Sequence, residues 1–423
     1  MENEDHVTME LQALLDKQPL IQTKRCSIYK VPDQIRETNV KAYIPTVVSI
    51  GPLHHGDPRL QKMEDHKLLY YKHFIQRSNA SLSELVSCVR WLEPQISACY
   101  SEKIDLTVDE FLKVILVDSA FIIEFLFEDE WTKGDIIFSQ QWLRNQINSD
   151  LILLENQLPF FVLEKIYNLA FASMLPNGGH EFPSFTLLDF AFAFSVSFTF
   201  TINKILKPPP HDSSILHFTD MFRYLLLKQQ PSGRKDASLA LGRCASELAE
   251  AGVKFIVNKS SSSMLDLEFK NGTLTIPPIQ VEDGTEIWLR NVVALEQCHY
   301  PKQHYITDYV RFLGHLMNTN KDAGVLIKAG IIDCIVGGGN YESSVAKLFN
   351  DVRKNILVTD TNVDFLQICN DLNGYYKNPW HRMMATLRGD YFATPWKAAG
   401  SIAAIVLLIL TVIQTVCSIL QVK

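Results

Sequence analysis

Apolar residues recur at helical spacing along most of the chain, and one run near its end is continuously apolar. From Ala398 to Leu420 there are 23 residues without a charge, and 12 of them are Ile, Leu or Val. As a helix this run would extend about 34 Å, enough to cross a hydrocarbon core of about 30 Å. The pattern predicts a transmembrane anchor whose main side chains are Ala398, Gly400, Ala404, Leu407, Leu408, Ile409, Leu410, Ile413 and Leu420.

The residues before this run suit a membrane–water boundary. Tyr391, Trp396 and Lys397 form the expected interface belt, because aromatic rings and basic side chains favour the headgroup region. More Lys and Arg residues precede the run than follow it, so the positive-inside rule places the long N-terminal part in the cytosol. We expect a single-pass protein of the plasma membrane or an endomembrane. Gly400 and Ala404 lie on a small-residue face through which two such helices could associate.

The rest of the chain predicts a mainly α fold. We expect a leader over residues 1–20, a large helical body over residues 21–395 and the anchor over residues 396–423. A second apolar run, residues 190–203, is too short to cross a bilayer. Its aromatic residues partly alternate, so its period does not decide between a core helix and a buried strand.

One β-hairpin is predicted within residues 265–276. Apolar and polar residues alternate there, and Asn271-Gly272 is the preferred pair for a tight two-residue turn. In that register Phe269 faces Leu274 and Leu267 faces Ile276. Beyond it, Asp283 and Glu286 look like a capping pair for a helix that contains Trp288.

Composition limits the classes of function and the compartment. The net charge of −7, with no segregation of basic residues, makes nucleic acid an unlikely partner. The eight cysteines include no CxxC pair, so we expect reduced, buried thiols in a reducing compartment. The N-terminus shows no secretory signal. The sequons at Asn79, Asn258 and Asn271 matter only if the body enters the secretory lumen.

The densest cluster of titratable residues contains His54, His55, Asp57 and His66, the residue types that bind metals or shuttle protons. A helix beginning near Gln61 would instead place His66 on an apolar face, which favours packing over catalysis. The chain contains no motif of a zinc peptidase, a serine hydrolase, a phosphate-binding loop or a kinase. We therefore expect no cofactor.

Glu155, Asn156 and Gln157 interrupt a strongly apolar stretch. If buried, these side chains need hydrogen-bond partners. Pro159 suits the first turn of a following helix, because it has no amide hydrogen to satisfy. We interpret the trio as a structural element that binds backbone groups at this junction, with a ligand site as the alternative.

Four stretches of the sequence carry a resemblance to a known family: Ile44-Pro45 with residues 48–56, residues 63–67, residues 151–163, and Arg290-Asn291 with residues 295–298. In these stretches the sequence resembles the plant family called domain of unknown function 247. It departs from the family pattern at residues 117–120, where Gly and Cys more often follow the Asp. The resemblance implies a plant membrane protein with a C-terminal helix and no established enzymatic activity, and some relatives are implicated in reproductive self-recognition.

The leading hypothesis is a non-enzymatic, membrane-anchored module that recognises proteins, possible roles being signalling or reproductive self-recognition. Its expected partners are the lipid bilayer and proteins that the sequence does not identify. The alternative is an enzyme, or a small-ligand or metal-binding protein, that uses His54, His55, Asp57 and His66.

Overall fold

The computed structural model describes residues 7–12, 25–127, 134–171, 186–198, 208–210, 214–227, 232–261, 263–335, 340–386 and 395–421. Most of these residues are helical and the strands are short, so the predicted mainly α fold is confirmed. The chain divides into two compact units. Unit 1 comprises Met1–Phe200, Lys204–Leu226 and Gly284–His304, and unit 2 comprises Thr201–Asn203, Leu227–Asp283 and Tyr305–Lys423.

Unit 1 is built around one long buried helix, α5. This helix is apolar on nearly all sides, so it must be covered on all sides. Helices α3, α4, α9 and α10 pack against it. The described helices of unit 1 are a short helix over residues 7–12, α2 (Asp33–Arg36), η1 (Val40–Tyr43), α3 (Gln61–Arg77), α4 (Leu82–Ser97), α5 (Val108–Phe127), α7 (Ile136–Ser139), α8 (Gln141–Asp150), α9 (Phe160–Ala170), α10 (Leu187–Phe198), α11 (Phe218–Leu226) and α13 (Thr285–His299).

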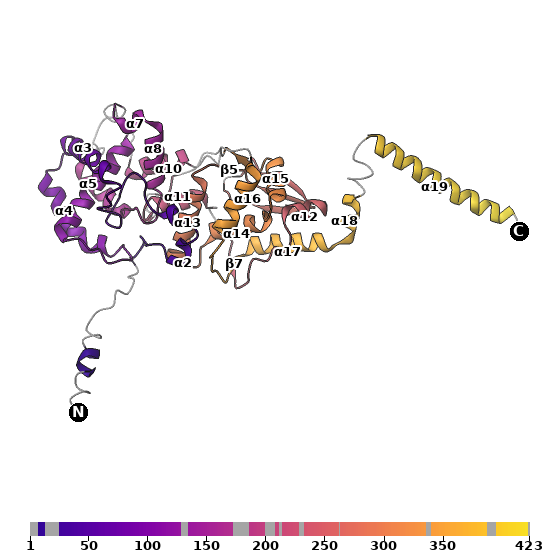
Figure 1. The fold of residues 1–423 in the computed structure, drawn as a ribbon, viewed down its shortest axis with the longest axis horizontal. Helices are drawn as coiled ribbons and strands as arrows, with labels where there is room; N and C mark the ends of the chain where they lie inside the picture. The colour runs from indigo at the N-terminus through magenta and orange to yellow at the C-terminus, as the bar shows by residue number, and fades with distance from the viewer. Residues whose placement is uncertain are drawn as a thin grey trace. The chain divides into compact units, whose positions relative to one another are not determined.

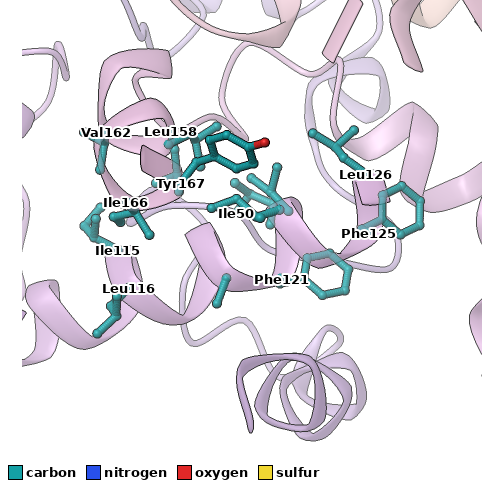
Figure 2. Close-up of a cluster of buried hydrophobic side chains, with 14 of the residues drawn as sticks. Ile50, Ile115, Leu116, Phe121, Phe125, Leu126, Leu158, Val162, Ile166 and Tyr167 are labelled. Atoms are coloured by element: carbon teal, nitrogen blue, oxygen red, sulfur yellow. The ribbon is translucent and has the colours of Figure 1, made fainter. Parts of the chain in front are cut away.

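Two segments outside the helices also enter this core. Figure 2 shows Ile50 and Leu158 among side chains of α5 and α9, including Phe121 and Ile166. Ile50 is 1% exposed, although it belongs to a stretch before α3 that has neither helix nor strand. The chain around residue 50 is therefore part of the interior, and its backbone polar groups must find partners there.

In the part of unit 2 that the structure describes, helices are combined with three small sheets. The sheets pair β1 with β7, place β4 between β2 and β3, and pair β5 with β6. The described elements are β1 (Arg234–Lys235), α12 (Ala245–Glu250), β2 (Lys254–Val257), β3 (Glu268–Lys270), β4 (Thr273–Ile276), β5 (Ile279–Val281), α14 (Tyr305–Leu316), α15 (Asn320–Lys328), β6 (Ile332–Cys334), α16 (Tyr341–Val352), β7 (Thr361–Asn362), α17 (Val363–Lys377), α18 (Pro379–Thr386) and α19 (Pro395–Gln421).

The predicted hairpin is confirmed as β3 and β4. Phe269 lies opposite Leu274, as the alternation requires. Asn271 and Gly272 both have positive φ, 51° and 74°, which is the backbone geometry of the predicted tight turn. The hairpin is not isolated, because β2 pairs in parallel with β4 and completes a three-stranded sheet.

The bounds of two helices test the predictions for the aromatic run at residues 190–203 and for the helix that contains Trp288. Residues 187–198 form helix α10, so the aromatic run is helical as far as the structure describes it. The helix that contains Trp288 exists as α13, but the predicted Asp283–Glu286 cap is wrong. Gly284 precedes its first residue, and the Glu286 carboxylate instead accepts hydrogen bonds from Asn39 and Arg290.

The eight cysteines are unpaired thiols. Cys26, Cys99 and Cys369 are buried, as expected, and burial raises the pKa of the Cys99 thiol to about 11. Four others are half-buried, whereas Cys417 is exposed on α19, so the prediction of burial is wrong there.

The apolar C-terminal run forms one continuous helix, α19, drawn as the yellow coil that ends the chain in Figure 1. Its stretch Ala399–Ser418 is long enough and apolar enough to cross a membrane. None of that stretch is buried, and Leu407 at its centre is 65% exposed. Such a row of apolar side chains is costly in water.

Candidate functional site

The polar trio lies in the interior of unit 1, where Glu155, Asn156 and Gln157 are each at most 3% exposed. The Asn156 side chain accepts a hydrogen bond from the Ile50 amide at 2.7 Å. It donates another to the Val48 carbonyl at 3.0 Å. A buried amide that both accepts and donates replaces the backbone partner that an extended segment would find in a sheet.

Gln157 binds the chain on either side of α9. Its side chain donates to the carbonyls of Leu151 and Leu153 and accepts from the Phe218 amide at 3.0 Å. Pro159 directly precedes the first residue of α9. The predicted structural role of the trio, bonding backbone groups at the junction before α9, is confirmed, and the trio also binds backbone groups of residues 31, 48, 50 and 218.

Two aspartates complete the support of residues 46–51. Asp150 accepts from the amides of residues 46–48 at 2.7–3.1 Å, and Asp118 accepts from the Gly51 amide at 2.8 Å. Gly51 has φ +73°, and a Cβ there would lie 2.6 Å from the Gln157 carbonyl oxygen, so only glycine fits. Buried side chains thus fix this whole segment.

A buried ion pair lies beside that segment. The Lys67 Nζ donates to Asp118 at 2.5 Å, to the Ser49 carbonyl at 2.8 Å and to Glu64 at 2.8 Å. Lys67 and Asp118 are both 1% exposed. Burial alone would lower the pKa of Lys67, but the charges of Asp118 and Glu64 outweigh it and raise the pKa. Lys67 therefore stays charged, whereas burial raises the pKa of Asp118 in spite of the neighbouring Lys67 ammonium and the hydrogen bond from Gly51.

Glu155 connects the N-terminal part of the chain to the same region. Its carboxylate accepts from the Val31 amide at 2.8 Å and from the Arg36 guanidinium, and its other oxygen lies 3.4 Å from Nε2 of His54. Burial raises the pKa of Glu155, but the hydrogen bonds from His54, Arg36 and Val31 together bring it below its ordinary value. His54 thus lies against the buried carboxylate of Glu155 and does not form a ligand set with His55 and His66.

Helix α13 contributes the last member, Asn291, and a separate buried ion pair. Asn291 accepts from the Leu154 amide at 2.9 Å and donates to the Ala42 carbonyl at 2.8 Å. One turn and a half later, Glu296 accepts from Arg223 at 3.1 Å, and both side chains are buried. All four stretches that carry the family resemblance therefore supply members of one buried polar network.

We call this network the polar hub. It consists of Asp118, Asp150, Glu155, Asn156, Gln157, Lys67 and Asn291, together with the backbone groups they bind. Most of the hydrogen bonds of these side chains go to backbone amides and carbonyls, so the hub holds the surrounding chain in place.

The histidine cluster is not brought together as a ligand set. His55 is exposed, His66 is half-buried on α3, and Asp57 forms a two-pronged ion pair with Arg59. Hydrogen bonds from Arg59 lower the pKa of Asp57 to about 2. Within the described ranges, no group of three or more His, Cys, Asp or Glu is placed to hold a metal ion.

The predicted anchor residues and two of the three predicted interface residues lie on helix α19. The predicted anchor residues all belong to α19, and Trp396 at its start is 87% exposed. Lys397 lies in the same helix, whereas Tyr391 falls outside the described residues. Association of two anchors through Gly400 and Ala404 stays a prediction.

The three sequons lie in different surroundings. Asn79 is exposed just after α3, and Asn271 is exposed at the hairpin turn. Asn258 is half-buried. Of the three, Asn79 and Asn271 are therefore the more accessible to a modifying enzyme.

Unit 2 has an open groove of about 590 Å³ beside the hairpin turn. Its wall includes the Tyr375 ring, which stacks on His381 with centroids 3.8 Å apart. The groove is lined by Phe269, Asn271, Gly272, Asn370, Asp371, Gly374, Tyr375 and His381.

Sequence reasoning missed several hub members, although weak signals existed. Lys67 stands with Met63, Tyr70 and Phe74 on the buried face of α3, where a lysine needs a partner. Asp150 directly precedes an apolar run in the same way. An ionisable residue at an apolar-face position was the signal for both.

The fold and the hub define a mainly helical protein in which buried side chains hold the non-helical segment of residues 46–51. Near its C-terminus the described chain has one helix of membrane-spanning length. The chain belongs to the family called domain of unknown function 247, described as plant proteins of unknown function, whose profile matches residues 28–410.

Two relatives from Arabidopsis thaliana are similar over most of their length. UPF0481 protein At3g47200 is 28% identical, and the match covers 94% of this chain and 87% of that protein. UPF0481 protein At3g02645 is 23% identical, and the match covers 92% of this chain and 89% of that protein. No solved structure matches the chain significantly.

Proposed function

We propose that this protein is a single-pass membrane protein whose helical units act, without catalysis, as a protein-recognition module on the cytosolic side. The observation that carries the proposal is α19, an unburied helix whose stretch Ala399–Ser418 is of membrane-spanning length. Leu, Ile and Val each favour a bilayer centre by about 0.3–0.6 kcal/mol, so the 12 such residues of the run supply roughly 4–7 kcal/mol.

Recognition is the role that the other observations favour. A tether confines the units to a surface and raises their effective concentration toward partners there, so modest contacts suffice. The hub supports this role because it gives unit 1 a rigid surface, and preorganised surfaces bind at a smaller entropic cost. Signalling and reproductive self-recognition are processes in which such a module would act.

The anchor is tested by substitution within the full chain. Leu408→Arg with Ile409→Arg places two charges at the helix centre, each costing about 2.5–3.5 kcal/mol. That cost offsets the favourable sum, so the protein should become extractable from membranes by alkaline carbonate. Leu408→Ala with Ile409→Ala is the matched control and should stay in the membrane. If the arginine variant is retained as firmly as the wild type, the anchor proposal fails.

Orientation is tested by glycan analysis of the full chain in plant cells. A cytosolic body receives no N-linked glycan, so endoglycosidase should leave its electrophoretic mobility unchanged. A mobility shift that Asn79→Gln or Asn271→Gln abolishes would place the units on the lumenal or extracellular side and reverse the proposed topology.

Proximity labelling from the full chain, compared with a chain that ends at Pro395, then identifies the partners.

A further inference from the structure

Helix α18 carries an exposed apolar stripe. Trp380, Met383 and Met384 are spaced i, i+3, i+4 and so lie on one side of the helix. They are 64%, 48% and 43% exposed. A tryptophan and two methionines left open to water on one short helix form a surface that favours an apolar or interfacial partner.

The neighbouring side of α18 is fixed to unit 2. The His381 ring lies flat on Tyr375 of α17, with an interplanar angle of 9°. The helix also has a defined start, because Asn378 Oδ1 accepts from the Trp380 amide at 3.0 Å and Pro379 occupies the first position. The stripe is therefore held in one orientation on unit 2.

The covalent chain keeps this stripe close to α19. Eight residues separate Thr386, the end of α18, from Pro395, the start of α19. A fully extended chain spans at most about 3.5 Å per residue, which limits the separation of these two ends to about 30 Å. If α19 enters a bilayer, α18 lies within reach of its headgroup region.

The charge of the sequence around α18 also favours a membrane surface as the partner. Between positions 377 and 397 the sequence contains four basic residues, Lys377, Arg382, Arg388 and Lys397, against the single acid Asp390. The whole chain, by contrast, has a net charge of −7. A local positive excess beside a membrane-length helix is attracted to anionic headgroups, and tryptophan is enriched at that depth.

We propose that α18 is an interfacial helix that immerses Trp380, Met383 and Met384 in the headgroup region of the bilayer that α19 crosses. This inference rests on the proposed anchor. Its consequence is orientation: through the His381–Tyr375 stack, α18 sets which face of unit 2 rests on the membrane. A protein partner for the stripe is the competing outcome of the test.

The test uses the full chain in nanodiscs that contain phosphatidylcholine, phosphatidylserine and lipids brominated near the headgroup end of the acyl chain. Bromine quenches tryptophan fluorescence on contact. We expect Trp380→Phe to remove about half of the bromolipid quenching and Trp396→Phe to remove most of the rest. Trp91→Phe, at an exposed site in unit 1, is the matched control and should leave the quenching unchanged.

A second variant separates immersion of the stripe from the local environment of one ring. Met383→Glu with Met384→Glu should reduce the Trp380 quenching severalfold and leave the Trp396 quenching intact. If Trp396 is quenched but Trp380 is not, the inference about α18 is overturned while the anchor stands. If the protein does not co-elute with nanodiscs, the anchor itself is overturned.

Discussion

Asn156 offers the sharpest test of the polar hub. Its side chain is fully buried and forms three hydrogen bonds, one from the Ile50 amide and one each to the carbonyls of Val48 and Asp150. Replacing Asn156 with Ala removes all three. The buried backbone groups of Val48, Ile50 and Asp150 would then lose these partners.

The loss in the free energy of unfolding can be estimated from these three hydrogen bonds. A buried amide without a partner costs about 1–3 kcal/mol, and carbonyls with a second lone pair cost less. With the small cavity that the truncation creates, we expect a loss of about 3 kcal/mol in the free energy of unfolding of unit 1. The matched control is Asn145→Ala on the exposed face of α8, where a change within about 0.5 kcal/mol is expected.

Thiol labelling of Cys99 measures this loss in unit 1. Cys99 is buried, and burial raises its pKa to about 11, so the folded protein at mildly alkaline pH contains almost no reactive thiolate. Labelling in increasing urea, read by mass spectrometry of the Cys99 peptide, therefore reports unfolding. With a urea dependence of about 3 kcal/mol per molar, the midpoint should fall by about 1 M. A midpoint shift no larger than that of Asn145→Ala would refute the structural role of the hub.

Three further predictions concern other parts of the chain. Lys67→Met leaves the buried Asp118, whose pKa burial already raises, without its cationic partner, so the free energy of unfolding should fall by about 3–5 kcal/mol. Adding Asp118→Asn should recover part of that loss in urea titrations, and no recovery would contradict the pairing. His217 is buried, and burial lowers its pKa to about 4, so the folded state disfavours protonation. The free energy of unfolding should therefore fall by up to about 3 kcal/mol as the pH decreases from about 6.5 toward 4. His217→Asn should abolish this pH dependence. Gly272→Ala should destabilise the hairpin by about 2 kcal/mol in thermal unfolding, because φ is +74° and a Cβ would lie 2.7 Å from the Tyr375 hydroxyl. Gly56 has a similar φ but open space around it, so Gly56→Ala should cost about half as much. Equal losses would rule out the contact with Tyr375.

The elements that the sequence predicted best are those whose information is local. The hairpin register follows from the turn pair Asn271-Gly272 and the alternation beside it, and the structure reproduces it. The start of α3 at Gln61 and the membrane-length helix are also local patterns. The pairing of Lys235 with Thr361 was not predictable, because two-residue strands so far apart in the chain carry no periodic signal.

The same distinction applies to the hub. The need of Glu155, Asn156 and Gln157 for partners was readable, since polar side chains in an apolar stretch must be satisfied. The partners were not readable, because Ile50 and Val31 lie more than 100 positions away in the chain. The stripe on α18 was missed for a different reason: its eight residues are too few for a periodic pattern to stand out.

The hub also explains why family resemblance says so little about function here. The stretches that carry it place their polar side chains on buried backbone groups, as Asn156 does for Ile50 and Asn291 for Leu154. Substitutions there change stability, and so such positions report the fold. Under the proposed recognition role, the side chains that distinguish partners would be exposed ones such as Trp91 and Trp142, which are 71% and 63% exposed and lie outside those stretches. Variants that alter partner choice without altering stability should therefore map to exposed positions, and a partner-specific effect from a hub substitution of unchanged stability would contradict this division.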